Sequence, residues 1–218
     1  MKRFNFILVA VCAILACFMI SCNSCKSGKT SNSEEVTEGG LVVERTISTD
    51  REYMFVNYGE DYRWFETCIL LNAFLDEENC NPDSIVGVSN VFQAVIERGD
   101  STSQSYDTEV VLFSHAGDES QIDVKHAFWV EDLPMNDEDI TVTFKQAFER
   151  VMQANCPKPH SKQCVLRKQL GPKAANPQYI FGNTKSQLYV DAVTGEVSDI
   201  NPVFGDVEGF KMPLGEWP

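Results

Sequence analysis

The sequence predicts an α+β fold in which a helix packs on a curved antiparallel sheet. A strongly amphipathic stretch between Thr143 and Gln153 predicts the helix, and three short segments rich in β-branched and aromatic residues follow it. The order of a helix followed by three strands is predicted a second time earlier in the chain, which indicates two tandem α-β-β-β units. The 218 residues are enough for one domain or two small ones.

The first 21 residues have the regions of a secretory signal. Two basic residues precede an apolar run over residues 4–20, and small residues follow it. Met19–Cys22 resembles a bacterial lipobox, so we expect cleavage after residue 21 and acylation of Cys22. Cys17 is the rival acylation site, and an uncleaved anchor is the alternative to cleavage.

Residues 22–40 are rich in Ser, Gly, Lys and Glu and predict a flexible tether. An N-terminal α+β unit over residues 41–135 follows. Its predicted elements are strands at Leu41–Ile47 and Glu52–Tyr58, a long helix at Glu60–Glu78, and a meander of strands at Ile85–Arg98, Tyr106–His115 and Gln121–Glu131.

The second unit covers residues 136–200 and begins with the amphipathic helix. Thr143 and Gln146 match a capping box, with an acidic cluster upstream where negative charge favours the helix dipole. Asn155–Pro157 ends the helix, because proline cannot continue it. The first predicted helix ends in a similar way at Asn79–Pro82, and the cysteines of the two endings, Cys80 and Cys156, are 76 positions apart. This similarity favours an internal duplication, although two unrelated helix ends could also converge on it.

Three strands and a tight turn complete this unit. The strands are predicted at Cys164–Leu170, Gln178–Phe181 and Gln187–Ala192, separated by Gly-, Pro- and Asn-containing turns. Asp191–Glu196 predicts a tight turn, in which the Asp side chain bonds the backbone and a later Gly accepts positive φ. Residues 201–218 predict an extended aromatic strap laid over the domain.

Two segments of the second unit resemble a PepSY or PepSY-like domain. They are Thr143–Ala147, which reads TFKQA, and Leu188–Val197, which reads LYVDAVTGEV, and together they bracket about a quarter of the chain. The loop between helix and strand departs from the family pattern with the insertion Cys156–Cys164. The resemblance implies a cystatin-like plan of a helix on a curved sheet. It also implies a small, non-catalytic, exported module linked to peptidase inhibition or envelope maintenance.

Charge divides the chain into two regions. The part after the expected cleavage carries 16 basic and 32 acidic residues, which argues against binding nucleic acid. Glu44–Ile140 has a net charge of −17 and Thr141–Lys185 a net charge of +7. We favour mutual docking of the two regions over the alternative of a basic binding face. That face would comprise Lys158, His160, Lys162, Arg167 and Lys168.

The cysteines predict one disulfide in an exported protein. Cys156 and Cys164 bracket a short loop, and a bridge between them would contribute about 2–3 kcal/mol. Zinc binding by these two residues and His160 lacks a fourth ligand, so we expect no metal and no cofactor. His115 and His126 are read as ordinary sheet residues, since no motif directs a Ser, Cys or carboxylate to them.

These features together predict a lipid-anchored module of the cell envelope, on the outer membrane, its periplasmic face or the cell surface. We expect it to bind a protein or an extended peptide, or to restrain a peptidase, through the loops Lys158–Lys162 and Gly171–Asn176. One alternative is a structural lipoprotein that docks a larger envelope complex. A hydrolase with unrecognised catalytic residues is the third hypothesis.

Overall fold

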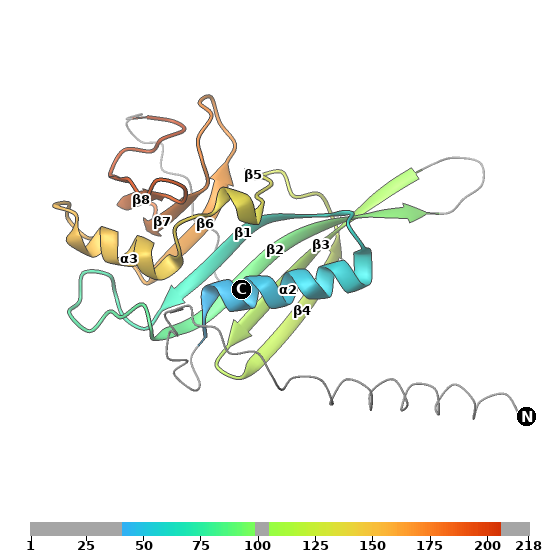
Figure 1. Cartoon of the computed structure of the whole chain (residues 1–218), viewed down its shortest axis with the longest axis horizontal. Coiled ribbons are helices and arrows are strands. Elements are labelled where there is room, and N and C mark those ends of the chain that lie inside the picture. Colours follow the sequence, from blue (N-terminus) through green and yellow to red (C-terminus); the bar gives the residue numbers. More distant parts are fainter. Residues whose placement is uncertain (1–40, 99–104, 206–218) are drawn as a thin grey trace, which may run out of the picture. The chain divides into compact units, whose positions relative to one another are not determined.

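An antiparallel sheet of nine strands forms the centre of the structure, a computed structural model that describes residues 41–98 and 105–205 (Figure 1). Eight of the strands run in the order β4-β3-β2-β1-β6-β7-β8-β9, and β5 pairs with β6 beside this path. The strands are β1 (Tyr62–Leu71), β2 (Ile85–Arg98), β3 (Ser105–Ala116), β4 (Glu119–His126), β5 (Asp132–Leu133), β6 (Gln163–Gln169), β7 (Gln178–Gly182), β8 (Gln187–Asp191) and β9 (Val197–Ser198). The helices are α2 (Val43–Tyr58), α3 (Phe144–Gln153) and the short 3₁₀ helix η1 (Asp137–Asp139).

The sheet consists of two halves with the same order of elements. In the N-terminal half, Val43–His126, α2 precedes a meander of β1 to β4; in the C-terminal half, Phe144–Ser198, α3 precedes a meander of β6 to β9. The first strands of the two meanders, β1 and β6, pair antiparallel at the centre, and each meander runs outward from there. The predicted α+β class is therefore confirmed, and each helix is followed by four strands rather than three.

Both helices pack on the same face of the sheet and share one hydrophobic core. The side chains of Met54 from α2 and Phe148 from α3 belong to a single buried cluster with residues from β1, β2, β3, β6, β7 and β8. A smaller cluster of Val165, Ile180 and Tyr189 lies on the opposite face of the sheet. Since adjacent residues of a strand point to opposite faces, β6, β7 and β8 each contribute to both clusters.

Helix α3 confirms the prediction for its stretch, including the way it begins. The Thr143 hydroxyl accepts a hydrogen bond from the Gln146 N–H at 3.3 Å, and the Gln146 side chain accepts one from the Thr143 N–H at 3.0 Å. The Phe144 N–H donates to the carboxylate of Glu44 in α2 at 2.8 Å, 100 residues earlier. The start of α3 is thus stabilised both locally and by the other helix.

Helix α2 contradicts the prediction of two strands at Leu41–Ile47 and Glu52–Tyr58. Its buried residues Val43, Ile47, Asp50 and Met54 recur at spacings of three and four, as on one face of a helix. Several residues between them are β-branched or aromatic, which favours strands locally. Burial against β1 and β2 outweighs that preference.

Strand β1 contradicts the prediction of a helix at Glu60–Glu78. It lies at the centre of the sheet, and its residues from Trp64 to Thr67 are buried in succession. A strand covered on both faces has no polar alternation, so its sequence resembles that of a broadly apolar helix. The long-helix prediction arose from that ambiguity.

The remaining predicted strands correspond to β2, β3, β4, β6, β7 and β8 with small shifts at their ends. Strand β4 ends at His126 instead of continuing to Glu131. The turn after β8 is also confirmed. The Asp191 carboxylate accepts hydrogen bonds from the N–H groups of Val193 and Thr194, both at 2.9 Å, and Gly195 has a φ of +73°.

The structure shows no bridge at the predicted disulfide: Cys156 and Cys164 are both free thiols. Cys164 is fully buried in the core and Cys156 packs at its edge. The predicted signal, lipobox cysteine and tether, and most of the strap, lie outside the described residues. Within the described residues, no helix is long and apolar enough to cross a bilayer.

Candidate functional site

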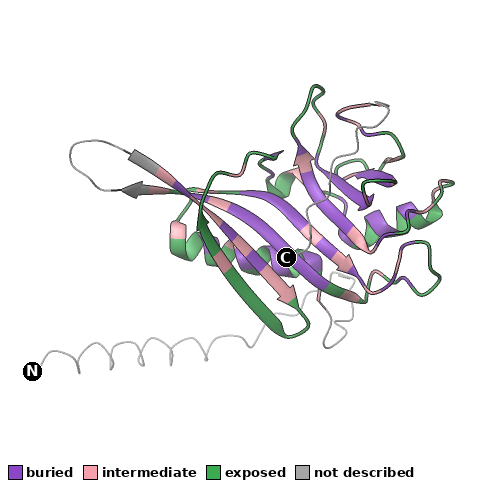
Figure 2. Cartoon of the chain, turned by 180° about the vertical axis from the view of Figure 1, so that it is seen from behind, coloured by how far each residue is buried: buried purple, intermediate pink, exposed green. Residues whose placement is uncertain are grey.

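The two edges of the sheet differ greatly in length and exposure. At one edge, β9 has two residues and is followed directly by the loop over residues 199–205. At the other edge, β4 has eight residues, seven exposed and one half-buried (Figure 2). A long exposed edge strand offers unpaired backbone groups to another chain, and proteins normally protect such edges. The β4 edge is therefore our first candidate for a binding site.

The hairpin between β3 and β4 determines which backbone groups of β4 face outward. Ala116 and Glu119 flank its two-residue turn, and the N–H of Ala127 donates to the carbonyl of Thr108 at 3.2 Å. In an antiparallel pair, backbone hydrogen bonds are made at alternate residues. The odd-numbered residues of β4 thus bond to β3. The even-numbered residues, Ser120, Ile122, Val124 and His126, direct their N–H and C=O groups away from the sheet.

Apolar side chains lie along the same edge. Ile122 and Val124 are 42% and 45% exposed, opposite the buried Phe113 and Val111 of β3, and so project from the helix-covered face. Beyond the strand, Phe128 and Val130 are 71% and 70% exposed. A row of exposed apolar groups beside outward-directed backbone donors and acceptors is the combination that strand addition uses.

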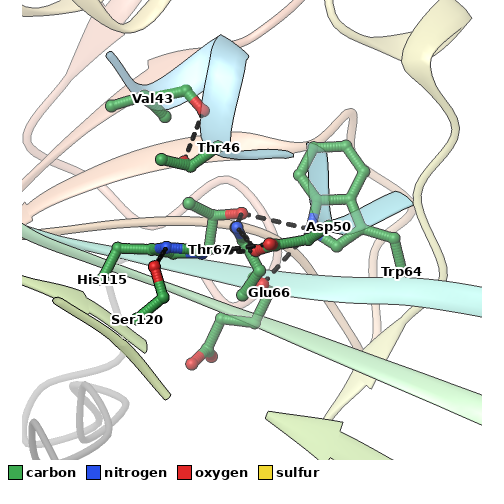
Figure 3. Close-up of polar contacts among 9 residues, drawn as sticks. Val43, Thr46, Asp50, Trp64, Glu66, Thr67, His115 and Ser120 are labelled. Atoms are coloured by element: carbon green, nitrogen blue, oxygen red, sulfur yellow. Dashed lines mark hydrogen bonds and ion pairs between the residues drawn. The ribbon is translucent and has the colours of Figure 1, made fainter. Parts of the chain in front are cut away.

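A Ser-His-Asp arrangement lies at the turn end of this edge (Figure 3). The His115 ring of β3 lies within hydrogen-bond distance of the Ser120 hydroxyl through Nδ1, at 2.9 Å, and of the Asp50 carboxylate of α2 through Nε2, at 2.9 and 3.0 Å. Ser120 is exposed and Asp50 is buried. Burial raises the pKa of Asp50, although hydrogen bonds from Asn90 and His115 oppose that rise.

This arrangement continues into the core as a chain of hydrogen bonds. The Asn90 amide of β2 donates to Asp50 at 2.7 Å, the Thr67 hydroxyl of β1 donates to Asn90 at 2.5 Å, and the Trp64 indole donates to Thr67 at 3.1 Å. The chain fixes α2 on three strands. Sliding α2 by one turn would leave a buried carboxylate and amide unpaired, at a cost of about 1–3 kcal/mol for each group.

A second polar cluster is buried on the opposite face, at the junction of the two halves. The Arg167 guanidinium of β6 is fully buried and lies 3.3 Å from the Glu66 carboxylate of β1 and 3.5 Å from the Asp132 carboxylate of β5. Glu66 and Arg167 are also register partners across the central strand pair. Shifting that register by one residue would turn Arg167 into the apolar core, so the ion pair specifies how the halves align.

Several atoms of this second cluster have no hydrogen-bond partner. Among residues 41–98 and 105–205, two guanidinium nitrogens of Arg167 and the Gln169 amide are buried in this state. Burial raises the pKa of Asp132 to about 7, although the positive charge of Arg167 opposes the rise. Ordered water is the usual partner of such mixed donors and acceptors.

Most residues of the predicted basic face make contacts within the protein. The Lys158 ammonium donates to the carbonyls of Ala154 and Cys156 at 2.6 and 2.8 Å, beyond the C-terminus of α3. The His160 ring stacks on Phe74 at 3.8 Å and contacts the Asp76 carboxylate at 3.0 Å.

Lys162 and Arg167 also face the acidic region of the chain. Lys162 lies over the Phe74 ring at 5.0 Å. Arg167 is buried and is not part of any exposed basic face, which corrects that expectation for this residue. These contacts agree with the docking account of the charge asymmetry, because basic residues after 141 pair with acidic residues before 140.

Lys168 and the predicted loop Gly171–Asn176 do come together. Lys168 and the end of the loop, Ala174–Asn176, line an open pocket of about 470 Å³ with Gln178, Asp191 and Pro202. Its Asp191 carboxylate is already bonded by the Asn176 amide at 3.0 Å. Burial raises the pKa of this carboxylate, but the N–H groups of the turn and two side-chain amides bring it below its ordinary value. The pocket is a secondary candidate for a small polar group.

The sequence reasoning missed both polar clusters. No linear motif joins Asp50 to His115, which are 65 residues apart, and Asp50 fell between two wrongly predicted strands. Buried Arg167 could have been suspected, because it lies in a predicted strand where neighbouring apolar residues indicate cover on both faces. Among residues 41–98 and 105–205, no group of three or more His, Cys, Asp or Glu side chains is placed to hold a metal ion.

Comparisons with protein-family models, with curated proteins and with solved structures return no match for this chain.

Proposed function

We propose that this protein is a non-catalytic, lipid-anchored binding module of the cell envelope that takes an extended protein segment onto the β4 edge of its sheet. The PepSY-like segments and the lipobox-like Met19–Cys22 support the location and the class. Acylated Cys22 would attach the chain to the membrane, and residues 23–40 would let the sheet reach its partner. A peptidase held in this way would be restrained through its own extended segment.

The observation that carries the proposal is the difference between the two sheet edges. The β9 edge has only two residues, both half-buried, whereas the β4 edge has eight residues and includes the half-exposed side chains of Ile122 and Val124. Main-chain hydrogen bonds would supply affinity, and the alternating side chains would supply specificity. Solvent-exposed β4 can accept a strand without any rearrangement of the core.

Photo-cross-linking of the full-length chain in its native cells tests the site. A photoreactive amino acid in place of Gln121 or Lys125, both on β4, should give specific adducts. The same amino acid in place of Lys158 or Lys173, outside the edge, should give few. Adding Val124→Pro should abolish the β4 adducts, because proline removes an outward N–H and blocks strand addition.

The proline variant should keep the fold, since the N–H of Val124 does not bond to β3. A matched control, Asp123→Pro, removes an N–H that does bond to β3 and should destabilise the hairpin. Adducts that form mainly at Lys158 and persist with Val124→Pro would place the partner on the basic loop instead. They would favour the structural lipoprotein that docks a larger envelope complex.

One specific observation favours a second candidate, a hydrolase. Ser120, His115 and Asp50 have the contacts of a nucleophile, a base and an orienting carboxylate, although Ser120 contacts Nδ1 rather than Nε2 of the ring. Labelling with a fluorophosphonate probe tests it directly. Covalent labelling that is lost in both Ser120→Ala and His115→Gln would support the hydrolase. Labelling equal to that of a heat-denatured control would exclude an activated serine.

A further inference from the structure

We propose that the segment held on the β4 edge is β4 of a second copy of this chain, paired antiparallel about Val124. The inference rests on the proposed function and names the partner of the same site. Such a pair would continue the sheet across a two-fold axis, with the same strand contributed by both copies.

Backbone geometry restricts how β4 can pair with itself. Opposite residues of an antiparallel pair share a face, so an outward-directed residue must lie opposite another outward-directed residue. The two-fold axis therefore passes through a residue and not between residues. Four residues in the middle of β4 can lie on the axis: Ile122, Asp123, Val124 and Lys125.

The four arrangements differ in which charged side chains of β4 lie opposite each other. An axis at Asp123 places two carboxylates opposite each other, and an axis at Lys125 does the same with two ammonium groups, both of which are unfavourable. An axis at Ile122 places Asp123 opposite the neutral Gln121, and its opposite charges, Glu119 and Lys125, meet only towards the ends of β4. An axis at Val124 places Asp123 opposite Lys125 twice, so each copy offers the opposite charge to the other.

The same register suits the backbone and the apolar side chains. Val124 pairs with Val124, and Ile122 pairs with His126, at positions whose N–H and C=O groups face outward. Each such pair exchanges two hydrogen bonds. Ile122 and Val124 of both copies would form one apolar row on the helix-covered face, and Phe128 would lie beside the hairpin of the other copy.

The ion pair that β4 already makes is compatible with this register. Asp123 and Lys125 lie on the same side of the strand at 2.8 Å, and both are partly exposed. Two copies would bring these groups into a four-charge cluster with opposite charges alternating across the axis. The buried area of one strand pair is small, so we expect a weak dimer that forms most readily when both copies are tethered to one membrane.

Cysteine cross-linking in the full-length, membrane-attached chain tests the register. Val124→Cys places two thiols on the axis, where opposite Cα atoms are about 5.5 Å apart, and a short bismaleimide should join two copies. Ile122→Cys is the matched control, because residue 122 of one copy is offset by four residues from residue 122 of the other, about 14 Å. Wild type, which contains its native cysteines, gives the background.

Charge exchange tests the partner. Asp123→Lys or Lys125→Asp, each on the Val124→Cys background, should reduce the dimer yield at least severalfold, since like charges then face each other. Co-expression of these two variants should restore the yield, because every opposing pair is again complementary. The heterodimer is recognised by a different tag on each variant.

Three results would overturn the inference. They are equal cross-linking of Val124→Cys and Ile122→Cys, cross-linking of Ile122→Cys alone, and no cross-linking above wild type. If any of them occurs while Val124→Pro still removes the β4 photo-adducts, the proposed function stands with a different chain as the partner. If Val124→Pro leaves those adducts unchanged, the edge is not the site, and the proposed function fails on its own evidence.

Discussion

The N-terminal and C-terminal halves of the sheet share one order of elements, yet they are stabilised in different ways. Helix α3 has a capping box and an entirely apolar buried face, whereas α2 lacks a side-chain cap and buries Asp50. The C-terminal meander ends in the short β9, and the N-terminal meander ends in the long, exposed β4. Local signals dominate in the C-terminal half, and contacts between distant segments dominate in the N-terminal half.

This difference indicates a division of roles. In the C-terminal half, the rings of Phe144 and Phe148 hold α3 on Tyr179 and Phe181 of β7. The N-terminal half keeps an edge available and fixes its helix by hydrogen bonds. A binding edge needs such a rigid support, because strand addition depends on a backbone that is already extended.

Removing an aromatic ring from each helix should give the largest difference between the halves. Phe144 of α3 packs against Phe148, Tyr179 and Phe181, so Phe144→Ala should lower the free energy of unfolding by about 3–5 kcal/mol. Phe55 of α2 is 55% exposed, and Phe55→Ala should change that free energy by less than about 0.5 kcal/mol. Urea titration of both variants checks the comparison, and equal losses would contradict it.

The pH dependence of stability should report the junction between the halves. Burial raises the pKa of Asp132 from 3.8 to about 7. Between these values the native state retains a proton that the unfolded state has lost. The contribution of Asp132 to stability should therefore decrease as pH rises, by up to about 1.4 kcal/mol per pH unit, and level off above about pH 7.

Asp132→Asn removes this titration while it keeps the shape of the side chain. Urea unfolding from about pH 4 to about pH 8 should show a smaller loss of stability with rising pH in the variant than in the wild type. Parallel curves would show that Asp132 titrates normally in the native state. In that case the buried charges at the junction would be stable without protonation of Asp132.

The smallest expected effect concerns the starts of the helices. Thr143→Ala removes the cap of α3 and should lower the free energy of unfolding by about 1 kcal/mol. Val42, the N-cap residue of α2, makes no side-chain cap and is exposed, so Val42→Ser should raise the free energy of unfolding by about 0.5–1 kcal/mol. Thermal unfolding measures both shifts, and shifts of the same sign would refute the contrast.

The sequence predicted well where residues close in the chain determine the structure. Helix α3, its capping box and the turn at Asp191 all depend on partners within a few residues, so the sequence pattern was sufficient to predict them. Helix α2 and strand β1 depend on burial by distant segments. The β-branched and aromatic residues of α2 favour strands, and the continuous burial of β1 imitates a helix.

Only part of the candidate site could be predicted from the sequence. The strands of the meander were predicted, and β4 was among them, but its position at the edge follows from the pairing of β1 with β6, which no local pattern contains. The basic residues were identified by composition alone. Whether a charge such as that of Arg167 lies on the surface or inside depends on the strand order.

The hydrogen bond from the N–H of Phe144 to Glu44 has a consequence for folding. The first turn of α3 is completed by a residue 100 positions earlier, and Arg167 reaches Glu66 across 101 positions. Neither half can therefore finish its structure while the other is unfolded. We expect the sheet to melt in one cooperative step, and a chain whose C-terminal half is not yet synthesised to lack a stable N-terminal half.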